Sequence, residues 1–130
     1  MAKPESNVGW RLTLLHFEKF SFGSIKIDST IYDYDLVIDR GAVRKRKKKA
    51  SKSYRDTYGH TPVSTEETIP WRCRRLVIGT GAEGRLPVMP GVYKDAQLRK
   101  VELIVVPTRD AITLLNRGDL HTNAILHVTC

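Results

Sequence analysis

The rhythm of apolar and polar residues differs between the two halves of the chain. From residue 10 to residue 38, apolar and aromatic side chains largely alternate with polar ones, and the alternation is clear in residues 10–15. A period near two predicts strands that bury one face. Turn-forming residues at 23–24 and 28–29 interrupt the pattern. We therefore expect a small, mainly antiparallel β-layer in this half, with residues 32–38 as one of its strands.

The second half has a different pattern, with continuous apolar runs at residues 75–78, 103–106 and 124–128. Such runs are typical of strands buried on both faces, as in a parallel sheet that helices cover on each side. Helices are expected between the runs, a weaker one over residues 92–100 and an amphipathic one over residues 108–116. Right-handed crossovers would place the three strands side by side.

Local signals predict where the helices start and stop. Thr108 is expected to cap the second helix, and Gly118 to end it. Ser64 and Glu67 have the spacing of a capping box, which predicts a short helix that starts at Ser64 and stops near Pro70.

Together these patterns predict one α/β domain over residues 1–130. We expect three layers, with a central mixed, largely parallel sheet flanked by helices and an extra antiparallel β-layer from the N-terminal half. Residues 1–9 are expected to be a loose N-terminus, because they contain little that could be buried. Residues 43–58 are expected to form a basic loop that could be mobile.

The formal net charge is +8, and much of the excess positive charge lies in the run of residues 44–49, which Lys52 extends. A block this dense repels itself and requires solvent or an anionic partner. One interpretation is a contact with nucleic acid or another polyanion, driven by counterion release. The other is a solvated surface loop, which the absence of a recognisable nucleic-acid-binding motif around the run favours. The candidate polyanion contacts are Arg44, Lys45, Arg46, Lys47, Lys48 and Lys49.

The two cysteines, Cys73 and Cys130, are too few for a disulfide framework, which favours a reducing, cytoplasmic location. No apolar stretch approaches the roughly 18 residues of a membrane span, and residues 1–7 lack the apolar segment of a secretory signal. We therefore expect no membrane partner. His127 and Cys130 have a metal-ligand spacing, but two ligands are half a site, and no metal is expected.

A Gly-x-Gly-x-x-Gly loop at residues 79–84 follows the first apolar run, and Pro107, Thr108 and Arg109 follow the second. Ligands of open α/β sheets collect at this edge, where glycine backbone N–H groups and the side chains of Arg85 and Arg109 could hold a small anion. The alternative is that the glycines only permit a tight connection. The candidate ligand-binding residues are Gly79, Thr80, Gly81, Gly84, Arg85, Thr108, Arg109 and His60.

A dinucleotide cofactor fits this loop poorly. The loop does not open directly into a helix, because Pro87 and Pro90 follow it. The acidic residue expected at the end of the second strand is also misplaced, since Glu102 begins that strand. No cofactor is expected.

No catalytic constellation is recognisable in the sequence, which favours a non-enzymatic protein without settling the question. No serine or cysteine lies in a nucleophile elbow. His60, His121 and His127 are far apart in the sequence, and His127, inside an apolar strand, is expected to be a hydrogen-bonded residue of the core or its rim. Cys73 lies between two arginines and is expected to be a partly buried, inert thiol.

Several short motifs between residues 20 and 130 occur together in one family. They are residues 22–27, Gly59-His60, residues 76–81, Pro107-Thr108 with Ala111, Asn116 near a helix end, and residues 127–130. The chain resembles the small α/β proteins that include the adipogenesis-associated domain protein of animals and a mitochondrial assembly factor for respiratory complex I. The resemblance implies a layered α/β fold with a central mixed sheet and an extra β-layer. Most members have no known molecular function, and the complex I relative acts by protein association.

One segment departs from this family. Residues 44–49 are basic where members usually have a tryptophan-bearing segment, so a shared partner does not follow. The sequence thus predicts an interaction or assembly domain with an unidentified protein partner. Two alternatives stay open: a small anionic ligand, or an unrecognised activity, at the paired loops 79–85 and 107–109, and a nucleic-acid contact through residues 44–49.

Overall fold

The computed structural model describes residues 15–130, which contain two sheets and the helices that cover them. The first strands are β1 (Phe17–Ser21), β2 (Ser24–Ile27) and β3 (Thr30–Tyr32), followed by β4 (Leu36–Asp39) and β5 (Ala42–Lys45). A 3-10 helix, η2 (Lys49–Tyr54), and the single turn α1 (Arg55–Tyr58) come next. The remaining elements are β6 (Arg75–Gly79), α2 (Pro90–Arg99), β7 (Glu102–Val106), α3 (Thr108–Leu115) and β8 (Thr122–Leu126).

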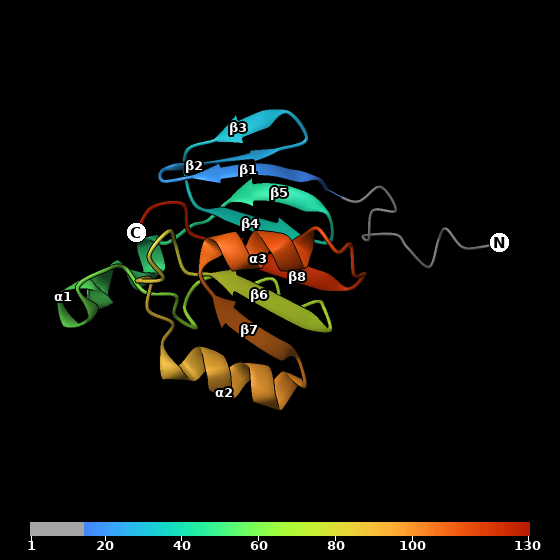
Figure 1. Cartoon of the computed structure of the whole chain (residues 1–130). Coiled ribbons are helices and arrows are strands. Elements are labelled where there is room, and N and C mark those ends of the chain that lie inside the picture. The colour runs from blue at the N-terminus through green and yellow to red at the C-terminus, as the bar shows by residue number, and fades with distance from the viewer. Residues whose placement is uncertain (1–14) are drawn as a thin grey trace.

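The central sheet has five strands in the order β5-β4-β8-β6-β7. Strand β6 pairs in parallel with β7 and β8, and β4 pairs antiparallel with β8 and β5. A separate antiparallel sheet, β1-β2-β3, lies above it (Figure 1). The expected mixed α/β fold, with three adjacent parallel strands and an extra antiparallel layer, is confirmed.

The N-terminal half divides between the two sheets in a way that the sequence did not reveal. Only β1–β3 form the extra layer, while β4 and β5 extend the central sheet. The expected continuous strand over residues 32–38 is therefore wrong. The chain must cross from one sheet to the other between Tyr32 and Leu36, so the strand is interrupted there. Residues 1–9, and the expected strand at 10–15 apart from Leu15, lie outside the described residues.

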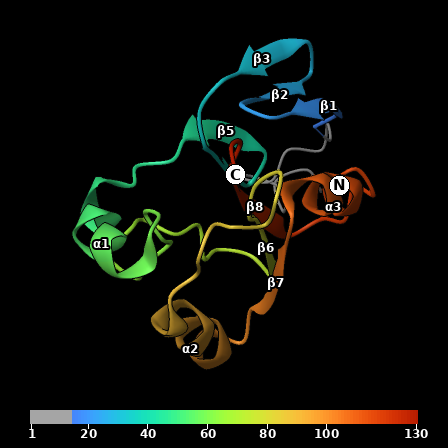
Figure 2. The same cartoon turned by 60° about the vertical axis from the view of Figure 1, so that its left-hand side comes forward.

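Both faces of the central sheet are covered. Val77 in β6 faces one cluster, with residues from β4, β8, α3 and the three-stranded sheet, whereas Leu76 and Ile78 face the other. That second cluster is closed by Val92 of α2 and by residues of the long β5–β6 connection. Figure 2 shows α3 on one side of the sheet and α1 and α2 on the other. Burial on both faces explains why these strands are continuously apolar.

The side chain of Asn116 attaches the three-stranded sheet to the end of α3. It follows α3, accepts a hydrogen bond from the backbone N–H of Phe17 (2.9 Å) and donates one to the Phe17 carbonyl (2.9 Å). This pair of bonds attaches β1 to the end of α3, so the three-stranded sheet is held by a specific polar contact as well as by packing.

The two long helices occur where they were expected, but their ends differ in detail. Pro90 begins α2 at the position where a missing N–H is harmless, and Lys100 ends it in the left-handed conformation. The predicted cap of α3 by Thr108 is wrong. Pro107 occupies the N-cap position, and the Thr108 hydroxyl is engaged elsewhere.

The segment from residue 43 to residue 70 corrects two expectations. Residues 43–58, expected as a loop, form part of β5 followed by η2 and α1. No helix starts at Ser64. Its hydroxyl does accept a hydrogen bond from the N–H of Glu66 (3.2 Å), but the turn then opens, because the Glu67 side chain is drawn into a buried ion pair. Across residues 15–130, no helix has the length and apolar content needed to cross a lipid bilayer.

Candidate functional site

The glycine loop is filled by the chain's own last residues. A Cβ on Gly81 would lie 2.5 Å from the backbone carbon of Cys130 and 2.6 Å from the carbonyl oxygen of Thr129. Ala82 donates its N–H to the Thr129 carbonyl (2.7 Å), and Arg85 donates its N–H to the Cys130 carbonyl (3.0 Å). These donors, which a phosphate would need, are therefore already occupied.

The structure does bring the two expected loops together, through one hydroxyl. Gly81 donates its N–H to Thr108 Oγ1 (2.7 Å), which in turn donates to the His127 carbonyl (2.7 Å). A Cβ on Gly79 would lie 2.9 Å from the same Oγ1. Thr80 donates its hydroxyl to the Val106 carbonyl (3.1 Å). The contacts of Gly79, Thr80 and Thr108 thus hold β6, α3 and the segment after β8 together at this edge of the sheet.

The two arginines of these loops point to other partners. Arg85 is exposed and pairs with Glu83 (3.0 Å), and Gly84 of the same loop is also exposed. The Arg109 guanidinium lies over the ring of Phe20, 5.9 Å from its centroid. Arg85 and Arg109 therefore do not form a shared anion site over the glycine loop.

The basic run is divided between the surface and the interior. Arg44 donates to the Thr68 carbonyl (3.2 Å), and the ammonium of Lys45 lies 5.1 Å from the ring centroid of Tyr34. Arg46 corrects an expectation, because its side chain is only 1% exposed and cannot contact a polyanion. The exposed members of the run that follow are Lys47, Lys48 and Lys49.

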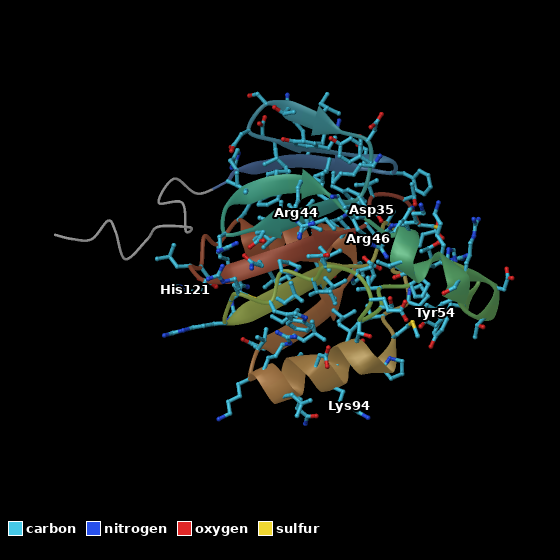
Figure 3. The ribbon with its side chains drawn as sticks, turned by 180° about the vertical axis from the view of Figure 1, so that it is seen from behind. Asp35, Arg44, Arg46, Tyr54, Lys94 and His121 are labelled. Carbon is cyan, nitrogen blue, oxygen red and sulfur yellow. The ribbon has the colours of Figure 1, made fainter. Side chains whose placement is uncertain are left out.

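Arg46 lies at the centre of a buried ion network. Its guanidinium donates to Asp35 Oδ2 (2.9 Å) and makes two bonds to Glu67, at 2.9 and 2.8 Å. Figure 3 shows Asp35 and Arg46 next to each other, on the side of the molecule where η2 and α1 lie. Burial would lower the pKa of Arg46, but these two carboxylates raise it above its ordinary value, so the guanidinium stays charged.

The same network fixes the position of η2. The buried hydroxyl of Ser51 donates to Glu67 Oε2 (2.5 Å) and accepts from the Ser64 hydroxyl, with 2.7 Å between the two oxygens. On the surface, Tyr54 donates to Glu66 (2.6 Å). The segment that carries Lys52 and Arg55 is therefore anchored at two points.

A second chain of hydrogen bonds starts from Asp35. His127 Nδ1 lies 2.9 Å from Asp35 Oδ2 and 3.0 Å from Oδ1, and His127 Nε2 lies 3.1 Å from Thr129 Oγ1. Burial would raise the pKa of the Asp35 carboxyl, but the hydrogen bond and electrostatic interaction with His127 and the charge of Arg46 hold it below its ordinary value. Asp35 is thus a carboxylate, and the expectation that His127 is a hydrogen-bonded core or rim residue agrees with its 8% exposure.

An open cavity of about 330 Å³, here called the basic pocket, lies beside this network. Its lining includes three cationic side chains that form no ion pair among residues 15–130, namely those of Lys48, Lys52 and Arg55. Within residues 15–130 no acidic side chain lines it, because Asp35 and Glu67 are buried against Arg46. The remaining lining residues are Arg46, Gly59, His60, Thr61, Leu86, His127, Thr129 and Cys130.

The two thiols have different surroundings. Cys130 lines the basic pocket with its sulfur 3.9 Å from His60 Nδ1. Cys73 donates to the Pro70 carbonyl (3.4 Å), and burial raises the pKa of its thiol to about 11. The described residues contain no cluster of three or more histidine, cysteine, aspartate or glutamate side chains that could hold a metal ion.

Several pocket residues were not found from the sequence. Lys52 extends the basic run, and Arg55 follows it, but nothing in the sequence shows that η2 and α1 turn both toward His60 and Thr129. Asp35 had only a weak signal in the sequence, because its partner His127 is 92 residues away. The only available clue to it was an acidic residue directly before an apolar strand.

Solved structures place the chain among known proteins. The conserved hypothetical protein PH1505 from Pyrococcus horikoshii OT3 is 30% identical and has a TM-score of 0.71, over 88% of this chain and 98% of that one. The chain belongs to the family of PH1505. MT938 is 25% identical, with a TM-score of 0.67 over 89% of this chain and 99% of that one.

More distant structures share only the fold of the PH1505 family. A Bordetella pertussis protein described as a Mth938-like domain is 13% identical with a TM-score of 0.56, over 98% of this chain and 90% of that one. No family model and no curated protein matches the sequence. The expectation of a small α/β family without a defined molecular function is therefore confirmed for the family of PH1505.

Proposed function

We propose that this member of the PH1505 family binds a small anionic ligand in the basic pocket. The observation that carries the proposal is the set of three unpaired cations, Lys48, Lys52 and Arg55, around one cavity without an acidic lining residue. Charge-assisted hydrogen bonds from such groups suit a phosphate or a carboxylate. The ligand site is thus moved from the paired loops 79–85 and 107–109 to the neighbourhood of His60.

The scaffold of the pocket supports this proposal. Arg46 is neutralised by Asp35 and Glu67, so it does not compete for the ligand and instead holds the pocket wall in place. Because the η2 segment that carries Lys52 is anchored through Ser51 and Tyr54, little backbone order has to be gained when a ligand binds. Two unpaired thiols agree with the proposed reducing, cytoplasmic location.

Isothermal titration calorimetry with inorganic phosphate and with citrate tests the proposal. The double variant Lys52→Ala/Arg55→Ala is expected to weaken binding at least about tenfold, the usual effect of losing charged hydrogen bonds. The matched control Lys47→Ala/Lys49→Ala removes the same charge outside the pocket and is expected to bind within about twofold of the wild type. Equal losses in both variants, or no binding by the wild type, would overturn the proposal.

Association with a protein partner is the competing proposal, and the resemblance to a complex I assembly factor supports it. The most exposed large apolar side chains come from different elements: Phe22 from the β1–β2 turn, Ile31 from β3, Leu98 from α2 and Leu120 from the loop before β8. Single exposed apolar residues of this kind are ordinary on soluble proteins.

A nucleic-acid contact through residues 44–49 is a third proposal. It now rests on Lys47, Lys48 and Lys49, because Arg46 is buried and Arg44 and Lys45 have partners in the fold. Binding of a single-stranded oligonucleotide that weakens steeply with salt, and that Lys47→Ala/Lys49→Ala abolishes, would support it over the pocket.

A further inference from the structure

The chain Asp35–His127–Thr129 gives the basic pocket a second property. We propose that Thr129 is the nucleophile of an ester-cleaving site, in which His127 is the general base and Asp35 positions the imidazole. The substrate class rests on the proposed function: a small ester that carries a phosphate or carboxylate group for Lys48, Lys52 and Arg55 to hold.

The geometry assigns these roles. His127 Nδ1 lies 2.9 Å from Asp35 Oδ2, so the carboxylate accepts the Nδ1 proton and fixes the tautomer. The other nitrogen, Nε2, is then free of a proton and lies 3.1 Å from Thr129 Oγ1, within reach of the hydroxyl proton. A hydroxyl, an imidazole and a carboxylate joined in this order form the arrangement that activates hydroxyl nucleophiles on unrelated folds.

The position of the three groups agrees with such a role. His127 and Thr129 are two residues apart in an extended segment, so their side chains fall on the same side, and both line the basic pocket. Asp35 is buried behind them, where it also accepts the N–H of Val128 (3.0 Å) and the Arg46 guanidinium. Two donors other than His127 therefore fix the carboxylate that orients the base.

The reaction balances without a cofactor. Thr129 Oγ1 attacks the acyl carbon and its proton passes to His127 Nε2. The bond from the acyl carbon to the leaving oxygen then breaks, and that oxygen takes the proton as an alcohol. Water attacks the acyl–Thr129 ester, gives a proton to His127 Nε2, and releases the acid while the proton returns to Oγ1.

A neutral fluorophosphonate probe tests the nucleophile without using the anion site. Peptide mass spectrometry of the wild type is expected to place the phosphonyl group on Thr129. Thr129→Val should abolish labelling, and Thr129→Ser should retain it, because serine keeps the hydroxyl. The matched control Thr113→Val changes an exposed threonine of α3 and should be labelled like the wild type. Urea unfolding of each variant checks that it folds.

Hydrolysis of p-nitrophenyl acetate and of mono-p-nitrophenyl succinate provides the kinetic test. Thr129→Val is expected to lower kcat/KM for both esters at least about 100-fold. Lys52→Ala/Arg55→Ala should remove only the preference for the succinate ester, which we expect to be about tenfold. No adduct on Thr129 in the wild type, or an activity that Cys130→Ser abolishes and Thr129→Val does not, would overturn the inference.

These results separate the inference from the proposed function. Phosphate binding that depends on Lys52 and Arg55, without an adduct on Thr129, refutes the nucleophile and leaves the anion site supported. An adduct and ester hydrolysis on Thr129, with no preference for the anionic ester and no phosphate binding, supports the nucleophile and refutes the anion site.

Discussion

Arg46 and Asp35 form an ion pair of 2.9 Å in the interior, and this pair joins the wall of the basic pocket to the central sheet. Arg46 follows β5, and Asp35 precedes β4, so the bond closes the open end of that hairpin. The Arg46 guanidinium also separates the Asp35 and Glu67 carboxylates from the cations that line the pocket.

Replacing Arg46 by methionine is therefore expected to destabilise the fold strongly. It leaves Asp35 and Glu67 as buried carboxylates without their cation, a change that typically lowers the free energy of unfolding by roughly 3–5 kcal/mol. Urea denaturation followed by circular dichroism measures the effect. The control Arg85→Met breaks an exposed pair with Glu83 and should change stability by less than about 1 kcal/mol. Equal unfolding midpoints for the two variants would contradict a structural role for the buried network.

The close contact between the glycine loop and the last residues gives a second prediction. Gly81 has a φ of +102° and has no room for a Cβ, whereas Gly23 has a φ of +91° and nothing within 4 Å of that position. We expect Gly23→Ala to destabilise by about 1 kcal/mol, from backbone strain alone. Gly81→Ala adds a steric clash with Cys130 and should destabilise by roughly 3 kcal/mol or more. Urea unfolding midpoints would compare the two, and a similar loss in both would show that residues 129–130 do not pack into the loop.

The fold was largely predictable because buried strands and helices have recognisable patterns of apolar residues in the sequence. The continuous apolar runs of β6, β7 and β8 identified the parallel strands, of which β6 and β8 are buried and β7 is a partly buried edge strand, and the stripe between β7 and β8 identified α3. The apolar pattern did not show which of the two sheets each N-terminal strand joins. Strand β2 alternates buried with partly buried residues, whereas Leu36, Val37 and Ile38 of β4 are all buried, and the pairing of β4 with β8 puts β4 in the central sheet.

The candidate site was predictable only in part. His60 and Lys48 were singled out from the sequence and line the pocket, but the glycine loop beside them is packed against the chain itself. In the run of cations at 44–49, sequence alone does not show that Arg46 points inward, because its two carboxylate partners come from elsewhere in the chain. Long-range polar pairs of this kind have no local pattern, which is why the Asp35–His127 pair was also missed.

The lowered pKa of Asp35 predicts a loss of stability in acid. Because the carboxyl titrates at lower pH when folded than when unfolded, the folded state binds fewer protons. Its contribution is therefore complete above the unfolded pKa and is lost as the pH falls below about 4. Urea unfolding at pH 7, 5, 4 and 3 measures the slope. Asp35→Asn should be less stable than the wild type at pH 7 and lose less on acidification, and parallel slopes would refute the assignment.

The thiols supply a further prediction, since burial raises the pKa of Cys73 to about 11 while its sulfur donates to the Pro70 carbonyl. The thiolate is the reactive form, so at pH 8 iodoacetamide should alkylate Cys73 in the folded protein at least about tenfold more slowly than in urea. The rate should rise as the pH is raised toward 10. Mass spectrometry of the tryptic peptides separates Cys73 from Cys130, and Cys130→Ser isolates the Cys73 rate. Alkylation of Cys73 at pH 8 as fast in the folded protein as in urea would mean that the Pro70–Cys73 turn does not bury the thiol.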